Sequence, residues 1–131
     1  MVLDTSAILA ILFAEPEASA MVEAIAHADV RAVGAPTLVE ASAVMLARKG
    51  PAGEVALDAL RQRLDLDVVP MSTEAAVFAR SAYGRFGKGV GSPGVLNFGD
   101  CLAYGVAMAA GDSLLFKGND FSATDVIVAS Y

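Results

Sequence analysis

The sequence has little of two residue types that build many catalytic sites: among 131 residues there is one cysteine and one histidine. Cys101 has no partner for an internal disulfide, which suits a reducing cytoplasm, and we interpret it as a small buried hydrophobic residue. Zinc sites use several nitrogen and sulfur ligands, which this chain cannot supply. A catalytic Ser-His-Asp or Cys-His arrangement is equally hard to build, so we interpret His27 as a residue without a catalytic role.

Long uninterrupted apolar segments are also missing, although the mean hydropathy is +0.57. The longest uncharged runs contain Gly, Pro, Ser and Asn, and residues 1–14 have neither a basic start nor enough apolar length. We therefore expect no membrane span and no secretory signal. With 56% hydrophobic and 18% charged residues, the sequence predicts a single cytoplasmic domain over residues 1–131 with a substantial core.

Positive charge is scarce: the chain has 9 Lys and Arg residues and 15 Asp and Glu residues, which give a net charge of −6. This balance argues against a general nucleic-acid coat, which would show a basic surplus. Residues 75–99, however, contain no acid and hold Arg80, Arg85 and Lys88, with Tyr83 and Phe86 between them. This patch could bind an RNA backbone beside an acidic centre, or consist of solvated helix-end cations with core aromatics.

Three carboxylates stand alone in apolar stretches. Asp4 is the only charged side chain in residues 1–14, Glu40 in residues 32–47, and Asp100 in residues 89–111. A charge inside an apolar element is costly unless something pairs with it, and none of these stretches supplies a cation. The partner must come from elsewhere in the fold or from outside the chain.

Local explanations exist for two of these acids. Asp4 could cap a helix that opens at Thr5 or Ser6, and Asp100 could complete a capping box with Asn97. Glu40 has no such explanation. The segment 37–47 is apolar almost all round, so we expect a largely buried helix that carries Glu40 inward or to the edge of a cleft. One shared cation would explain all three acids together.

Predicted strands and helices alternate along the chain. We expect strands at residues 1–3, 31–34, 67–70, 114–116 and 126–128, and helices at 7–13, from 16 onward, and at 36–49, 54–64, 73–86 and 98–110, with Thr73 as a possible cap. This order predicts an α/β fold, a mostly parallel sheet covered by helices on both faces. Ligands of such folds collect at the carboxyl ends of strands near the topological switch point.

The acids fit that rule. Asp4 directly follows the first strand, Asp120 lies just beyond residues 114–116, and Asp100 opens a helix after the Gly-rich loop 87–96. For Asp120, the run 118–120 could equally be ordinary turn chemistry. Oxygen ligands select a hard cation, magnesium or manganese, and such a cation suits phosphodiester hydrolysis. The Gly-rich loop lacks a Gly-Lys-Ser/Thr ending, so a P-loop is not supported.

Four segments carry a family resemblance. They are MVLDTS (1–6), LVEAS (38–42), LNFGDCLAY (96–104) and LLFKGNDF (114–121). In this order they resemble the signature segments of the PIN-domain ribonucleases, and more narrowly the VapC toxins of bacterial toxin–antitoxin pairs. Gly-Lys-Gly at 87–89 is also similar to that subfamily.

The resemblance implies a three-layer α/β/α PIN fold with about five strands. It implies a magnesium or manganese ion held by Asp4, Glu40, Asp100 and Asp120, with Ser6 orienting a ligand or water. It also implies RNA cleavage that arrests translation, neutralisation by a cognate antitoxin, and frequent homodimers. Members often carry an acid at the position of Asn119, so the fourth carboxylate could be delivered differently here.

Other classes fit less well. A receiver-type phosphoacceptor domain could use Lys117 but needs an acid pair after the first strand, where Asp4 is single. A dehalogenase-like phosphatase needs Asp-x-Asp there, and Ser6 occupies the second position. A non-catalytic PIN-like module that only binds a partner remains an open alternative.

Overall fold

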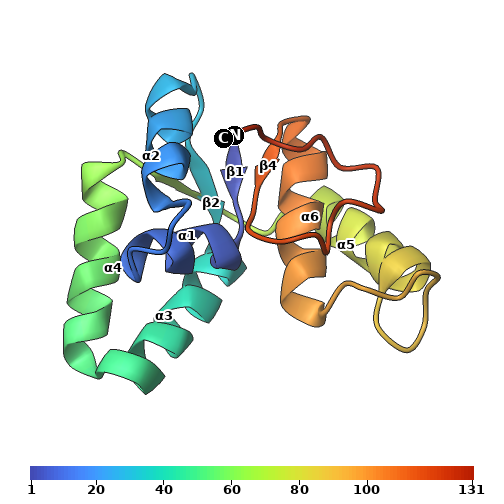
Figure 1. The fold of residues 1–131 in the computed structure, drawn as a ribbon. Helices are drawn as coiled ribbons and strands as arrows, with labels where there is room; N and C mark the ends of the chain where they lie inside the picture. The colour runs from blue at the N-terminus through green and yellow to red at the C-terminus, as the bar shows by residue number, and fades with distance from the viewer.

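A computed structural model describes all residues, 1–131, as a four-stranded parallel sheet between two sets of helices (Figure 1). The strands are β1 (Val2–Leu3), β2 (Ala32–Gly34), β3 (Asp67–Val69) and β4 (Leu114–Leu115). The helices are α1 (Thr5–Leu12), α2 (Ala18–His27), α3 (Ala35–Lys49), α4 (Pro51–Arg63), α5 (Thr73–Phe86) and α6 (Phe98–Ala110).

The strand order β3-β2-β1-β4 places the topological switch between β1 and β4. From β1 the chain crosses to β2 and β3 on one side, and it then returns to β4 on the other side. Because all strands are parallel, their carboxyl ends meet at one edge of the sheet. A crevice beside the ends of β1 and β4 is therefore the expected ligand site.

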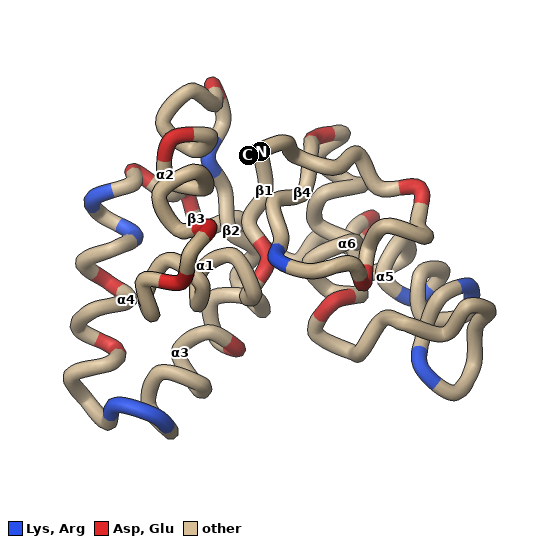
Figure 2. Tube along the Cα trace, viewed as in Figure 1, with Lys and Arg blue, Asp and Glu red and all other residues tan.

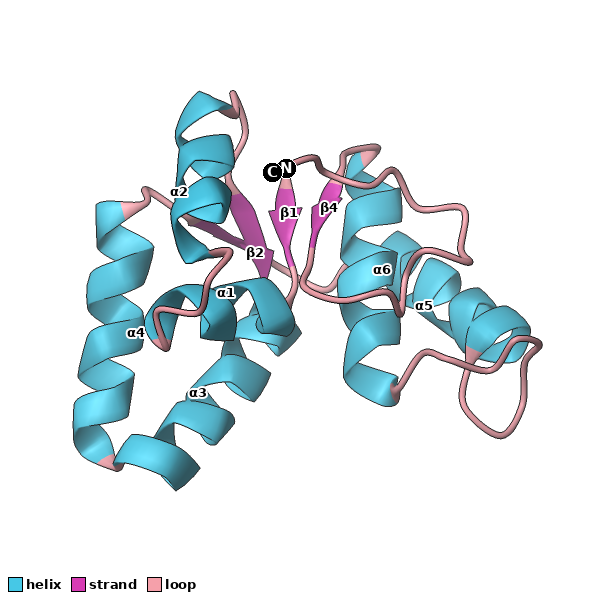
Figure 3. Cartoon of the chain, viewed as in Figure 1, coloured by secondary structure: helices cyan, strands magenta, loops and turns pink.

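Alternating strand residues form two separate cores. Val2 and its sheet partners Ala32 and Leu114 pack with α5 and α6, whereas the next residue in each strand packs with α1, α2, α3 and α4. This follows from the period of two in a strand, where successive side chains point to opposite faces. Figure 3 shows the resulting layers, so the predicted three-layer α/β/α fold is confirmed. No helix is both long and apolar enough to cross a membrane.

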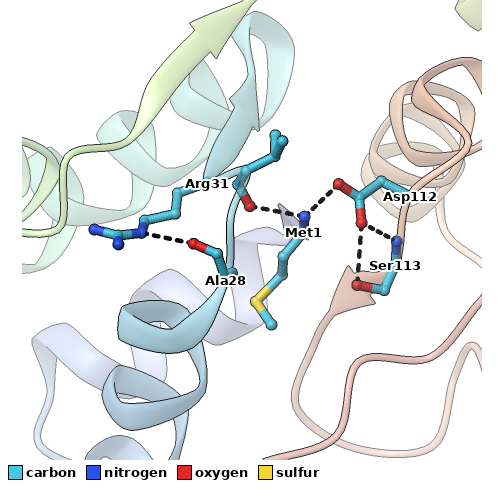
Figure 4. A network of polar contacts seen from close by, with 6 residues as sticks. Met1, Ala28, Arg31, Asp112 and Ser113 are labelled. Carbon is cyan, nitrogen blue, oxygen red and sulfur yellow. Dashed lines mark hydrogen bonds and ion pairs between the residues drawn. The ribbon is translucent and has the colours of Figure 1, made fainter.

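Polar contacts tie the amino ends of the strands together (Figure 4). The Met1 amino group donates to the Val30 carbonyl oxygen at 2.8 Å and pairs with the Asp112 carboxylate. That carboxylate also accepts from Ser113 N at 2.7 Å. These contacts join β1 to the segments that precede β2 and β4, at the edge opposite the predicted site.

Several sequence-based expectations need correction. Residues 126–128 form only a single bridge, Leu114 with Val128, in place of a fifth strand. The first helix begins at Thr5 because Asp4 caps it, and Ser72, not Thr73, is the N-cap of α5. The second helix begins at Ala18, after a turn that contains Pro16.

The largest correction concerns α3, which we expected to be mostly buried. Only Thr37, Ala41 and Met45 are buried, whereas Val39 is 69% and Leu46 41% exposed. Its apolar composition therefore does not indicate a core helix, and Glu40 lies at the border between the buried and exposed faces.

Candidate metal centre

Four acids reach the carboxyl edge of the sheet from four different elements. Asp4 follows β1, Glu40 lies in α3 after β2, Asp100 lies in the first turn of α6, and Asp120 lies in the segment after β4. Figure 2 shows acidic positions on α3, at the end of β1 and near the start of α6. The charges of Asp4, Asp120 and Glu40 all act on Asp100, so the four predicted acids lie at the same edge of the sheet.

Asp4 is the most buried of the four, with 3% of its surface exposed. It is the N-cap of α1, and its Oδ2 accepts hydrogen bonds from Ser6 N at 2.9 Å and Ser6 Oγ at 2.6 Å. Burial raises the pKa of Asp4, and the charge of Asp120 raises it further, while the Ser6 hydrogen bonds lower it. Both hydrogen bonds from Ser6 go to Oδ2 of Asp4, so Oδ1 accepts neither of them.

Asp100 is half-buried and takes part in the predicted capping box. Its Oδ2 accepts from Asn97 N at 2.7 Å, and Asn97 Oδ1 accepts from Asp100 N at 2.8 Å. Burial, together with the nearby charges of Asp4, Asp120 and Glu40, raises the pKa of Asp100 to about 6, although the hydrogen bond from Asn97 N opposes this rise. The capping explanation is therefore confirmed for this residue, and the neighbouring acids also act on its charge.

Glu40 contacts the start of α6. A methyl group added at Gly99 would lie 2.3 Å from Glu40 Oε2, so only glycine leaves room for this carboxylate beside Asp100. Burial raises the pKa of Glu40, and the charge of Asp4 raises it further. The nearby Thr5 hydroxyl lowers this pKa, and that hydroxyl is buried and has no hydrogen-bond partner.

Asp120 is exposed in the segment that leaves β4. Lys117 fixes the start of this segment, because its backbone N donates a hydrogen bond to Ser6 Oγ at 2.9 Å. Its Nζ pairs with Glu15 and with Glu17, the latter at 3.1 Å. Ser6 thus contacts both Asp4 and Lys117, which lies just after β4. The sequence alone did not indicate this contact of Lys117.

The donor set fits a hard divalent cation. All candidate ligands are oxygens, the charges repel one another when no cation is present, and a buried hydroxyl without a partner lies beside them. No three acidic, histidine or cysteine side chains lie close enough to surround an ion. The four acids therefore do not form a closed metal site in this structure.

The predicted basic patch is partly neutralised. Arg85 Nη1 pairs with Asp125 Oδ2 at 2.9 Å and its guanidinium lies over the Phe86 ring, 4.5 Å from the centroid. Arg80 and Lys88 are exposed and make no ion pair. Two of the three predicted cations are thus available to a ligand without breaking an existing contact.

The remaining candidates lie outside the acidic cluster. His27 is exposed on α2, where its Nδ1 lies 2.8 Å from the Glu23 carbonyl oxygen. Cys101 is 1% exposed, as expected for a small core residue.

Comparisons with known proteins agree with this geometry. The PIN domain profile matches residues 1–127. The chain is 44% identical to ribonuclease VapC28 of Mycobacterium tuberculosis, over 96% of this chain and 95% of that protein. It is 41% identical to ribonuclease VapC of Mycolicibacterium smegmatis, over 96% and 97%.

Two solved structures share the fold. VapBC2 of Rickettsia felis, bound to a DNA fragment from its promoter, has a TM-score of 0.76 and 16% identity over 97% of this chain and 94% of that chain. VapC20 of M. tuberculosis, described as a toxin that cleaves the sarcin–ricin loop, has a TM-score of 0.75 and 19% identity, with coverages of 96% and 95%. This chain therefore belongs to the PIN-domain family and, within it, to the VapC ribonucleases.

Proposed function

We propose that this protein is a metal-dependent endoribonuclease that hydrolyses RNA phosphodiester bonds and, as the toxin of a toxin–antitoxin pair in the cytoplasm, inhibits translation. The observation that carries this proposal is the gathering of four carboxylates from separate elements at the edge where β1 and β4 end. The names of the VapC relatives, which are ribonucleases, support the activity.

The proposed cation ligands are Asp4, Glu40, Asp100 and Asp120. A bound Mg²⁺ or Mn²⁺ supplies Lewis-acid stabilisation of the phosphate and makes a bound water more acidic. Ser6 holds Oδ2 of Asp4 through two hydrogen bonds, which orients the other oxygen of that carboxylate. Because the pKa of Asp100 is about 6, a positive charge nearby would favour its ionised form at neutral pH.

We also propose that the exposed Arg80 and Lys88 bind the RNA backbone, joined by Arg85 when it releases Asp125. Membership of the VapC family supports a cognate antitoxin as protein partner. A homodimer is the second proposed assembly. The exposed apolar side chains of α3, Val39 and Leu46, offer surface that a protein partner would cover.

The test is RNA cleavage by purified protein with Mg²⁺ or Mn²⁺. We expect Asp4→Asn and Asp100→Asn to abolish cleavage while the circular dichroism spectrum stays unchanged, because each substitution removes charge but keeps an oxygen that can cap its helix. Asp58→Asn, on the exposed surface of α4, is the matched control and should cleave normally. Equal cleavage in excess chelator, or by the Asp100→Asn variant, would show that the proposed mechanism is wrong.

A further inference from the structure

The segment that carries Asp120 is held at both ends by elements that carry other acids. At its start, Lys117 N donates to Ser6 Oγ, and Ser6 Oγ donates to Asp4 Oδ2. At its end, Asp125 Oδ1 accepts a hydrogen bond of 2.5 Å from the Tyr104 hydroxyl. Asp120 itself lies in the exposed turn between these two anchors.

Tyr104 is built into the same helix as Asp100. The two residues are four positions apart on α6, so they lie on the same face of the helix, one turn apart. Tyr104 is 1% exposed, and its ring packs in the core beside Phe86. Its hydroxyl is therefore a fixed point relative to Asp100, and it reaches the end of the Asp120 segment.

The segment between the anchors is itself compact. Phe121 is 2% exposed, and its ring lies 4.8 Å from the ring of Phe116 between centroids. Thr124 Oγ1 donates to the Phe121 carbonyl oxygen at 2.7 Å. A displacement of Asp125 would therefore be passed along a short, bonded path to Phe121, the neighbour of Asp120.

We propose that Tyr104 and Asp125 are positioning residues that fix the distance between the Asp120 and Asp100 carboxylates. This inference rests on the proposed function, because it assigns the two residues a role through the cation that the acids would hold. Neither residue touches the cluster: each acts by holding the segment that carries Asp120. Both side chains of the Arg85–Asp125 ion pair are half-exposed, and exposed ion pairs contribute little stability. The Tyr104 hydrogen bond therefore does most to hold Asp125 in place.

The test compares Tyr104→Phe with Tyr131→Phe, the same change at an exposed tyrosine that makes no side-chain hydrogen bond. Partners that hold metal ligands typically change metal affinity or activity by 10- to 100-fold when they are removed. We expect Tyr104→Phe to raise the Mn²⁺ dissociation constant, measured by calorimetry without RNA, by about tenfold. We expect kcat to fall by a similar factor while KM for RNA stays unchanged.

A double-mutant cycle with Asp120→Asn tests whether Tyr104 acts through Asp120. In the Asp120→Asn background, Tyr104→Phe should cause no further loss of Mn²⁺ affinity, because the carboxylate that it positions is gone. If Tyr104→Phe weakens Mn²⁺ binding equally in both backgrounds, or only lowers Tm, the positioning role is overturned. Asp125→Asn, which leaves the core intact, should repeat a part of the Tyr104→Phe effect if Tyr104→Phe folds poorly.

The outcomes also separate this proposal from the proposed function. If the wild-type protein neither binds Mn²⁺ nor cleaves RNA, both fail. If the wild type shows Mn²⁺-dependent cleavage and Tyr104→Phe matches it in kcat and metal affinity, only the positioning role fails. Lys88→Gln should behave differently from Tyr104→Phe, because Lys88 makes no ion pair, so loss of its RNA contact would raise KM and leave Mn²⁺ affinity unchanged.

Discussion

Asp100 makes the metal-free protein less stable as pH rises. Its pKa is about 6 in the folded chain, against a model-peptide value of 3.8, because burial and three neighbouring acids disfavour its charge. Well below pH 3.8 the carboxyl is protonated in both states, so it costs no stability. As pH rises from about 4 to about 7 the unfolded chain loses the proton first, and the free energy of unfolding falls.

The size of this effect follows from the shift. Two pKa units correspond to about 3 kcal/mol, since one unit is about 1.4 kcal/mol. Asp100 is only half-buried, so solvent screening reduces the expected effect to about 1.5 kcal/mol. Asp100→Asn removes the charge but keeps an oxygen that can accept from Asn97 N, so the helix cap survives. The variant should therefore be more stable than wild type near pH 7 by about 1.5 kcal/mol.

Urea unfolding followed by circular dichroism, in chelator at pH 4, 5, 6 and 7, measures this difference. The chain has no tryptophan, so intrinsic tryptophan fluorescence offers no signal. The difference between Asp100→Asn and wild type should be near zero at pH 4 and grow toward pH 7, whereas exposed Asp58→Asn should show no such growth. A difference that does not change with pH, or a variant less stable than wild type at pH 7, would refute the clustering of charges around Asp100.

Three further outcomes are expected. Mn²⁺ at about 100 times its dissociation constant should stabilise the protein by roughly 2.7 kcal/mol, and an unchanged Tm up to millimolar Mn²⁺ would contradict Mn²⁺ binding by these acids. Gly99→Ala should reduce cleavage strongly with little loss of stability, because the added methyl displaces only the flexible Glu40 carboxylate. Gly105→Ala should instead lower Tm, because its methyl would meet a backbone carbonyl of α5 at 2.3 Å; equal Tm losses for the two glycine variants would contradict this contrast. Raising the pH from 5 to 7 should increase the Mn²⁺ affinity measured by calorimetry, because Asp100 loses its proton in this range, and a pH-independent affinity would count against Asp100 as a ligand.

The ranges predicted for α5 and α6 match the structure to the residue, although Ser72 and not Thr73 caps α5. For α6, the helix carries its own boundary signals. Asn97 and Asp100 form a capping box, and Gly111 ends α6 in the left-handed conformation that favours glycine. These signals act within a few residues, so the sequence displays them directly. The order of strands and helices was readable for the same reason, and it predicted the edge of the sheet where the acids gather.

The errors came from features that depend on distant parts of the chain. The exposure of α3 is decided by which elements pack on it, and its apolar side chains Val39 and Leu46 find no cover within the chain. Residues 126–128 have the composition of a strand, but the backbone makes only one bridge to Leu114. The contact of Tyr104 with Asp125 joins residues 21 positions apart, and no local pattern marks it.

Helix capping explains how the fold tolerates its acidic cluster. Asp4 and Asp100 each lie at the start of a helix, where the backbone N–H groups and the helix dipole favour negative charge. Capping therefore offsets part of the cost that burial and mutual repulsion impose on these carboxylates. Each cap is made through Oδ2, so the same side chain can stabilise its helix and still present Oδ1 to a cation. Substitution by alanine would remove both roles at once, and only asparagine separates the loss of charge from the loss of the cap.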